Sequence, residues 1–307
     1  MESCHKFSFP LLTLLSLYMS FFVAHAEGLL TPRPFNNKIT AAFVFGDSTV
    51  DPGNNNYVKT LFRGNFPPYG KDFRDHVPTG RFTNGKLSTD LIVSYVGIKE
   101  YLPPYLDPNL SIEELMTGVS FASAGSGFDP LTPQISSVIS LPKQLEYFKE
   151  YKKRLQSAIG NRRTEAIIKE AVFLISCGTN DFVVNYFTLP IRRKSYTVSA
   201  YQQFVLQSFK QVLQGRLAHL DAKITYVDIF TPLIDMIQGL GKHDFDEVSH
   251  GCCGSGYLEA GFLCNPGSFV CNDASKYVFF DSIHPTEKTY INLFMASRPV
   301  IDSFIQD

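Results

Sequence analysis

Short apolar segments that alternate with amphipathic helical patterns constrain the fold of this chain most strongly. The segment 39–48, ITAAFVFGDS, is rich in Phe, Val and Ala and closes on a Gly-Asp-Ser turn, as a buried strand does. The same kind of pattern predicts further strands at 118–127, 170–181 and 222–230, and helical spacing predicts helices at 87–98, 141–159 and 199–220. A last helix is expected from 286 and should stop or kink before Pro299. This order predicts an α/β domain with three layers, in which helices cover both faces of a parallel sheet.

Small and polar residues end three of these predicted strands. They are Gly46-Asp47-Ser48, Ala124-Gly125-Ser126 and Gly178-Thr179-Asn180-Asp181. Parallel α/β sheets bind ligands beyond the carboxyl ends of their strands, so these residues are expected to meet at one edge. Each pattern alone is more common as a turn or a helix cap. Their joint placement at successive strand ends favours a functional site.

An aspartate and a histidine three residues apart, Asp281 and His284, complete this constellation near the end of the chain. A serine hydroxyl is a weak nucleophile unless a base lies within hydrogen-bond reach. We therefore predict Ser48 as the nucleophile and His284 as its base. Asp281 would fix the tautomer of the imidazole and stabilise the charge that it gains.

The oxyanion that forms when a serine attacks a carbonyl needs preorganised hydrogen-bond donors. Gly125 can bring its backbone N–H close to a substrate because it has no side chain, and Asn180 offers a side-chain amide at a strand end. The backbone N–H of Ser48 would complete the set. These residues predict an oxyanion hole.

The N-terminus has the pattern of a secretory signal peptide. Lys6 precedes an apolar run over 7–24, and Ala24-His25-Ala26 fits a signal-peptidase site, which predicts a signal peptide at 1–26 and a single domain at 27–307. An uncleaved membrane anchor is the alternative, against which Pro10 and the cleavage site argue. The mature protein is then expected to be secreted, extracellular or in the cell wall, without stable membrane insertion. With a net charge of −1 and no basic run, nucleic acid is an unexpected partner.

Four cysteines crowd into the Gly-rich segment 250–273: Cys252, Cys253, Cys264 and Cys271. In a secreted protein they indicate two disulfides. A bond between the two neighbours would be strained, so each is expected to pair with either Cys264 or Cys271. A four-thiolate zinc site is the alternative, although the spacing differs from paired C-x-x-C knuckles. Asn109-Leu110-Ser111 is a glycosylation acceptor if the chain is secreted.

Several longer motifs are similar to those of a known family. FVFGDSTVDPGNNN, GNFPPYGKDF, PTGRFTNGKLSTDLI, GVSFASAGSG, FLISCGTND and DSIHPTE resemble the plant GDSL-motif esterase/lipases, a branch of the SGNH hydrolases. The resemblance covers nearly the whole mature chain. It implies a parallel flavodoxin-like sheet and hydrolysis of carboxylic esters, often acyl or lipid esters, without metal or cofactor. It also implies Ser48 as nucleophile, Gly125 and Asn180 as oxyanion donors, and Asp281 with His284 as the remaining pair.

The chain departs from the family pattern in three places. Phe280 stands where relatives usually have Trp, and Ser120 where many have Asn. More seriously, relatives carry a further strand and helix between the helix at 199–213 and the strand ITYVDIF, a unit that is missing here. The last central strand would then have to take the position of the missing strand in the sheet. This shift would displace Asp281 and His284 from Ser48.

Three functions remain open on these grounds. The leading one is a secreted serine esterase that acts on a small-molecule or lipid ester. An acyltransferase would use the same triad but resolve the acyl-enzyme with a hydroxyl other than water. A protein that binds but does not catalyse would result if the missing unit had distorted the site.

Overall fold

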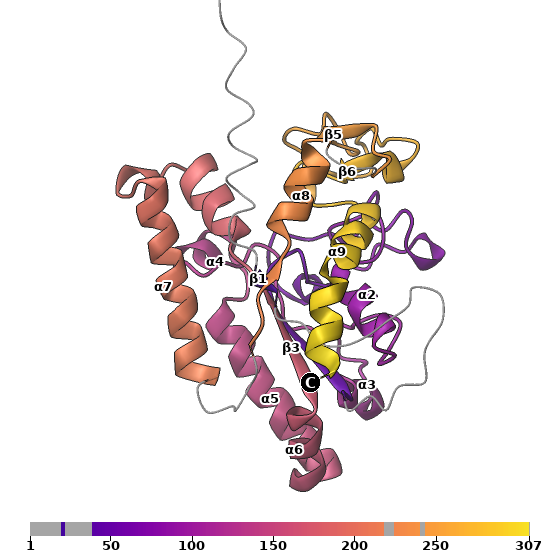
Figure 1. Cartoon of the computed structure of the whole chain (residues 1–307), viewed down its shortest axis with the longest axis vertical. Coiled ribbons are helices and arrows are strands. Elements are labelled where there is room, and N and C mark those ends of the chain that lie inside the picture. Colours follow the sequence, from indigo (N-terminus) through magenta and orange to yellow (C-terminus); the bar gives the residue numbers. More distant parts are fainter. Residues whose placement is uncertain (1–19, 22–38, 218–223, 240–242, 307) are drawn as a thin grey trace, which may run out of the picture.

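The computed structural model describes residues 20–21, 39–217, 224–239 and 243–306 (Figure 1). The strands are β1 (Ser20–Phe21), β2 (Ala41–Gly46), β3 (Ala171–Ser176), β4 (Val227–Asp228), β5 (Glu247–Gly251) and β6 (Tyr277–Phe279). The α-helices are α2 (Ser88–Tyr95), α3 (Ile112–Met116), α4 (Leu131–Ser136), α5 (Leu141–Ile159), α6 (Asn161–Lys169), α7 (Val198–Leu217), α8 (Phe230–Ile237) and α9 (Glu287–Gln306). The predicted signal peptide at 1–26 lies outside the described residues except for β1.

Two parallel strands form the centre of the sheet. β2 pairs with β3 along its whole length, from Ala41 opposite Ala171 to Gly46 opposite Ser176. The two strands approach closely at their carboxyl ends, where Gly46 has a φ of +144° and a Cβ would lie 1.8 Å from the Ser176 carbonyl oxygen. Only glycine fits there. The turn that follows carries Ser48.

The predicted strand at 118–127 runs beside β2 but forms only single bridges, at Ser120. Its backbone is parallel to β2: Phe121 N–H donates to Val44 O (2.7 Å) and Ser123 N–H to Gly46 O (3.0 Å). On its outer side, the amide of Asn54 donates to the carbonyls of Ser120 and Ala122. The backbone of residues 103–105 also pairs with Ser120 on this edge, so a short backbone segment and one side chain together bind the edge that faces away from β2.

Both faces of β2 are apolar, which explains the three layers. Successive strand residues point to opposite faces, so Ala42 and Val44 pack in a core with α2, α8 and α9, while Phe43 and Phe45 pack in a second core with α5, α6 and α7. Figure 1 shows these two groups of helices on either side of β3. The predicted three-layer α/β fold is confirmed.

The last central strand does not move into the slot beside β3, contrary to our prediction. β4 pairs antiparallel with β1, Val227 opposite Phe21, and β1 also contacts β3. Within the described residues, β1 therefore lies between β3 and β4; because Ser20–Phe21 belong to the predicted signal peptide, this pairing is one of the uncleaved chain. The reason is that β4 is only two residues long, and its Val227 is already buried in the core with α2 and α9. Moving β4 sideways would break that packing.

The helices predicted at 87–98, 141–159 and 199–220 appear as α2, α5 and α7, whereas α3, α4, α6 and α8 were not predicted, and α8 begins inside the predicted strand 222–230. α5 spans the residues that the spacing predicts, because the hydroxyl of Ser140 accepts from Lys143 N–H at its start and Gly160, at φ +84°, ends it. α9, in contrast, continues through Pro299 to Gln306, so the predicted stop is wrong. Ile301 beyond the proline is fully buried, and this packing holds the last turns in helical form.

Candidate active site

The structure brings Ser48, His284 and Asp281 together, although 236 residues separate the serine from the histidine. Ser48 lies in the turn after β2, and the other two lie in the turn between β6 and α9. Ser48 Oγ is 2.8 Å from His284 Nε2, and His284 Nδ1 is 2.6 Å from Asp281 Oδ2. A carboxylate only accepts hydrogen bonds, so Nδ1 carries the proton. Nε2 is then free to accept the proton of the serine hydroxyl.

The spacing of three residues between Asp281 and His284 has a local cause. Asp281 Oδ1 accepts the backbone N–H groups of Ile283 (2.9 Å) and His284 (2.7 Å), which is the turn that an aspartate side chain forms with the residues after it. The same turn leaves Oδ2 facing the imidazole. Asp281 is fully buried and His284 is 5% exposed.

The turn that holds His284 is anchored by residues near the start of the fold. Thr83 Oγ1 donates to the Pro285 carbonyl (2.9 Å), Glu287 N–H donates to Asn84 Oδ1 (2.9 Å), and the ring of Phe82 packs 4.9 Å from the imidazole. These contacts come from a segment that precedes the junction after α7. The expected displacement of Asp281 and His284 from Ser48 is therefore not found, because these contacts fix the turn.

The two residues predicted as oxyanion donors also lie at this edge of the sheet. Gly125 has a φ of +85°, and a Cβ there would lie 3.1 Å from Ser136 Cβ, so glycine is required. Asn180 directly follows the β3 turn, and its Nδ2 donates to Ser126 O (2.9 Å), which places its amide against the Gly125 turn. Within the described residues, the backbone N–H groups of Ser48 and Gly125 donate to no other group. Both can bind an oxyanion.

Buried side chains that sequence reasoning missed hold the Gly125 turn in place. Asp51 Oδ2 accepts Ala124 N–H (2.9 Å), and Asn55 Nδ2 donates to Ala124 O (2.9 Å). On the far side, Asp181 Oδ2 accepts Phe128 N–H (2.9 Å). Asp51 and Asn55 belong to DPGNNN, directly after Ser48. The signal that could have identified them is the run of Asp and Asn residues at 51–56, which lies close to Ser48 and follows the apolar strand segment 41–46.

Burial raises the pKa of three carboxyl groups around the site. The pKa of Asp47 rises to about 6, although Thr49 donates to the carboxyl and the neighbouring His284 opposes the shift. Burial likewise raises the pKa of Asp51 to about 6 and of Asp181 to about 7 against their hydrogen bonds. The described residues contain no group of three His, Cys, Asp or Glu side chains that could hold a metal ion.

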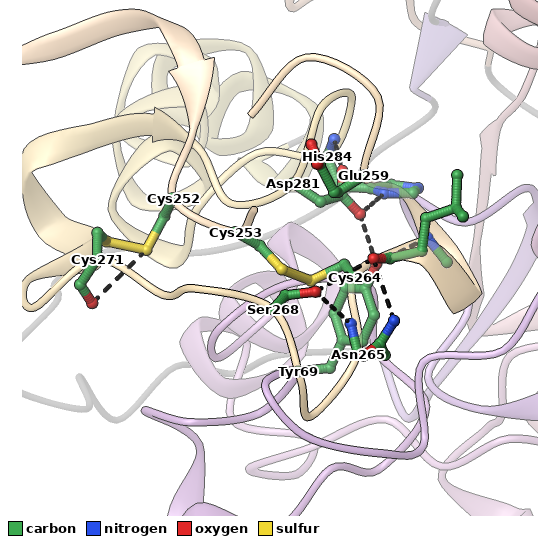
Figure 2. The surroundings of a disulfide bond; sticks show 12 residues. Tyr69, Cys252, Cys253, Glu259, Cys264, Asn265, Ser268, Cys271, Asp281 and His284 are labelled. Atoms are coloured by element: carbon green, nitrogen blue, oxygen red, sulfur yellow. Dashed lines mark hydrogen bonds and ion pairs between the residues drawn. A yellow bond between two sulfur atoms is a disulfide. The ribbon is translucent and has the colours of Figure 1, made fainter. Parts of the chain in front are cut away.

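The clustered cysteines form two disulfides, as predicted. Cys252 pairs with Cys271 and Cys253 with Cys264, so no thiolate of this group is left for zinc (Figure 2). Cys177 is a buried thiol in the core. The disulfide-bonded segment is hydrogen-bonded to β6 and to the residues around Asp281, through Cys253 N–H to Phe280 O (2.8 Å).

The two substitutions relative to the family pattern are accommodated. Ser120 Oγ donates to Val50 O (3.0 Å) and accepts from Ala122 N–H (3.2 Å), so this short side chain has partners for its hydroxyl. Phe280 is fully buried, and its ring lies 5.6 Å from that of Tyr69. A phenyl ring fills this position without a polar group that would need a partner.

A cleft of about 580 Å³ lies beside the Gly125 turn, between α4, α5 and α7. Its lining combines apolar residues such as Phe128, Leu141 and Leu145 with polar ones such as Gln134 and Gln211. Among the residues that the structure describes, no helix has the length and apolar character needed to cross a membrane.

A buried Ser–His–Asp arrangement at the carboxyl edge of a parallel α/β sheet defines the class of serine hydrolases. The comparisons agree. The family model for GDSL-like lipase/acylhydrolase matches residues 43–214. GDSL esterase/lipase At5g45960 of Arabidopsis thaliana is 50% identical over 330 residues, 88% of each chain, and GDSL esterase/lipase APG of the same plant is 39% identical over 345 residues, 94% of this chain and 95% of its own. This chain belongs to the GDSL esterase/lipase family, and it is a carboxylic ester hydrolase.

The aligned lengths also bear on the missing unit. For At5g45960, 88% of the 307 residues of this chain, or about 270, align over 330 residues, so the relative has about 60 residues with no counterpart here. The family model ends at 214, near the end of α7. Both observations agree with an internal strand and helix that this chain lacks.

Proposed function

We propose that this protein is a secreted serine esterase whose catalytic triad is Ser48, His284 and Asp281 and which works through an acyl-enzyme. The observation that carries the proposal is the continuous hydrogen-bond path from Ser48 Oγ through both imidazole nitrogens to a buried carboxylate, at 2.8 and 2.6 Å. This path places a general base beside the serine hydroxyl and a carboxylate acceptor behind that base.

The chemistry follows from this path. His284 Nε2 takes the proton of Ser48 as Oγ attacks the ester carbonyl, and Asp281 stabilises the imidazolium. The N–H groups of Ser48 and Gly125 and the amide of Asn180 bind the oxyanion of the tetrahedral intermediate. His284 then protonates the leaving alkoxide, which departs as the alcohol. Water, deprotonated by His284, attacks the acyl-enzyme. As the second tetrahedral intermediate collapses, His284 returns that proton to Ser48 Oγ, which releases the carboxylic acid and the free serine.

The apolar part of the cleft beside Gly127 favours an ester with an extended acyl chain. It includes Phe128, Leu141 and Leu145, and burial of each CH₂ group contributes about 0.8 kcal/mol. We therefore expect kcat/KM for nitrophenyl esters to increase with acyl length before it levels off. A steady decline from acetate onward would exclude the cleft as the acyl site.

Secretion is supported by the two disulfides, which persist in oxidising compartments. Asn109, in the glycosylation acceptor, is exposed. Residues around the predicted cleavage site after Ala26 lie outside the described ones. N-terminal sequencing of protein recovered from the medium of expressing plant cells should begin at Glu27, and recovery only from cell membranes would contradict secretion.

Labelling with a fluorophosphonate, which reacts with activated serines, tests the triad. Wild-type protein should be labelled, Ser48→Ala should not, and Ser275→Ala, which changes an exposed serine just before β6, should be labelled like wild type. Ester hydrolysis should follow the same pattern. Folded wild-type protein that is neither labelled nor active would instead be a protein that binds without catalysis.

A further inference from the structure

Tyr69 connects the disulfide-bonded loop to the candidate triad. Its hydroxyl donates to Asp281 Oδ2 (2.6 Å) and accepts the backbone N–H of Gly261 (2.9 Å). Gly261 lies inside the loop closed by the Cys253–Cys264 disulfide. Figure 2 shows Tyr69, this disulfide and the Asp281–His284 pair close together. The hydrogen-bond path from the loop to Ser48 therefore runs from the Gly261 N–H through Tyr69, Asp281 and His284.

We propose that Tyr69 is a positioning residue for the reaction: anchored by the Cys253–Cys264 loop, it holds the Asp281 carboxylate in the orientation in which Oδ2 meets His284. This inference rests on the proposed triad. It gives the cysteine-rich segment a role in catalysis, since that segment supplies the backbone N–H that orients the tyrosine hydroxyl.

The tyrosine ring has little freedom to move. It is 1% exposed and contacts the rings of Phe66, Phe82 and Phe280, with centroids at 5.8, 5.4 and 5.6 Å. Burial, together with the neighbouring Asp281 charge, raises the pKa of Tyr69 well above its usual value. The hydroxyl thus stays protonated and remains a donor. Aromatic packing fixes where that donor points.

The loop that anchors Tyr69 is itself fixed against the triad turn. Ser282 N–H donates to Glu259 O (2.9 Å), and Cys253 N–H donates to Phe280 O (2.8 Å). At the start of the loop, Gly251 approaches so closely that a Cβ would lie 2.5 Å from the carbonyl carbon of Asp281. The disulfide limits how far the segment with Gly261 can move from this surface.

Each oxygen of the Asp281 carboxylate accepts two hydrogen bonds, and Tyr69 supplies one of the four. Oδ1 accepts two backbone N–H groups, and Oδ2 accepts the imidazole and the tyrosine hydroxyl. Without the hydroxyl, Oδ2 loses one of its two donors, and the carboxylate is held only by His284 and by the two backbone N–H groups on Oδ1. Gly261 N–H would also lose its acceptor.

Tyr69→Phe tests this directly because it removes one oxygen and keeps the ring. We expect kcat to fall about tenfold, as the loss of a hydrogen bond to a charged group predicts, with KM close to wild type; the melting temperature should fall modestly, because two buried hydrogen bonds are lost. Tyr151→Phe is the matched control. Tyr151 is also fully buried, and its hydroxyl donates to Leu115 O (2.8 Å) in the core on the α5 side of the sheet, so its loss should leave kcat unchanged.

A double-mutant cycle with Asp281→Asn separates positioning from a merely structural role. If Tyr69 acts through Asp281, Tyr69→Phe lowers kcat no further once Asp281 is Asn. Wild-type kcat in Tyr69→Phe, or a tenfold loss that persists in the Asp281→Asn background, would overturn the inference. Replacing both Cys253 and Cys264 by Ser should cause a similar loss that does not add to that of Tyr69→Phe.

All rates are measured relative to Ser48→Ala, which keeps the two proposals distinct. Turnover that disappears in Ser48→Ala but is unaffected in Tyr69→Phe overturns the role of Tyr69 alone. Turnover that persists in Ser48→Ala overturns the proposed triad, and the positioning role with it.

Discussion

Replacing Asp281 by Asn should abolish most of the activity without unfolding the protein, and the hydrogen bonds of the carboxylate explain why. Each carboxylate oxygen accepts two hydrogen bonds. In Asp281→Asn, the amide nitrogen takes the place of one of these oxygens, and at either place it meets two groups that donate in the wild type. At the Oδ1 position it would meet the backbone N–H groups of Ile283 and His284, which cannot turn away. We therefore expect the nitrogen at the Oδ2 position, facing Tyr69 and the imidazole.

An amide N–H at that position forces the wrong tautomer on His284. Nδ1 must then accept, so the proton moves to Nε2, which points at Ser48 Oγ from 2.8 Å and can no longer act as a base. In a Ser–His–Asp triad this error lowers kcat about 10⁴-fold, or about 5 kcal/mol in transition-state free energy. The side chain keeps its shape and most of its hydrogen bonds, so the free energy of unfolding should change by only about 1–3 kcal/mol.

The assay is steady-state hydrolysis of a nitrophenyl ester, with thermal unfolding measured on the same preparations. Asp273→Asn is the control, since Asp273 also accepts a backbone N–H, from Ser275 (2.9 Å), but is exposed. It should retain wild-type turnover. A kcat within tenfold of wild type in folded Asp281→Asn protein would refute the reasoning, because something other than Asp281 would then set the tautomer.

Three further predictions concern the glycine turn, a buried carboxyl and a buried ion pair. Gly125→Ala should lower kcat by about 10²–10³ through a distorted oxyanion donor, whereas Gly160→Ala, at a similar φ but in open space, should not; equal kcat values would contradict this. The raised pKa of Asp47, about 6, means that the folded protein holds a proton that the unfolded chain has lost. The contribution of Asp47 to the free energy of unfolding should thus fall by on the order of 3 kcal/mol as pH rises from about 4 to about 7, and urea titrations of Asp47→Asn should show a total fall that is smaller by about this amount. Arg81→Met should lower the free energy of unfolding by about 3–5 kcal/mol, because it removes the partner of buried Asp90, which lies 2.7 Å from Arg81. A decrease below about 1 kcal/mol in denaturant unfolding would show that this ion pair contributes no more than an exposed one.

The layers of the fold were predictable because they depend on local pattern. Apolar residues on both faces of β2 require cover on both sides, and the spacing over 141–159 presents one apolar stripe for that purpose. Where a local rule failed, a distant contact opposed it. Pro299 does not end α9, since the buried Ile301 packs beyond it. The strand predicted at 118–127 is reduced to single bridges at Ser120, and Asn54 binds the carbonyls of Ser120 and Ala122 on its outer edge.

The candidate site was predictable in its chemical groups but not in its support. Ser48, Gly125 and Asn180 follow strand ends, and parallel strands bring those ends to one edge whatever the details of packing. The side chains that hold them, such as Asp51 and Tyr69, carry no signal of spacing. Their roles exist only once residues far apart in the chain are neighbours.

The sequence by itself determined which side chains can react and which segments form strands or covering helices. Side-chain chemistry and periodicity are properties of short segments, so both can be read locally. The tertiary structure alone decided that Cys252 pairs with Cys271, and that the turn with His284 is held by residues 82–84. Such pairings depend on which of many possible long-range contacts can form together without steric conflict, and a linear pattern does not encode that choice. For the same reason, the shortened chain keeps its Ser–His–Asp geometry: the contacts that fix it lie outside the missing unit.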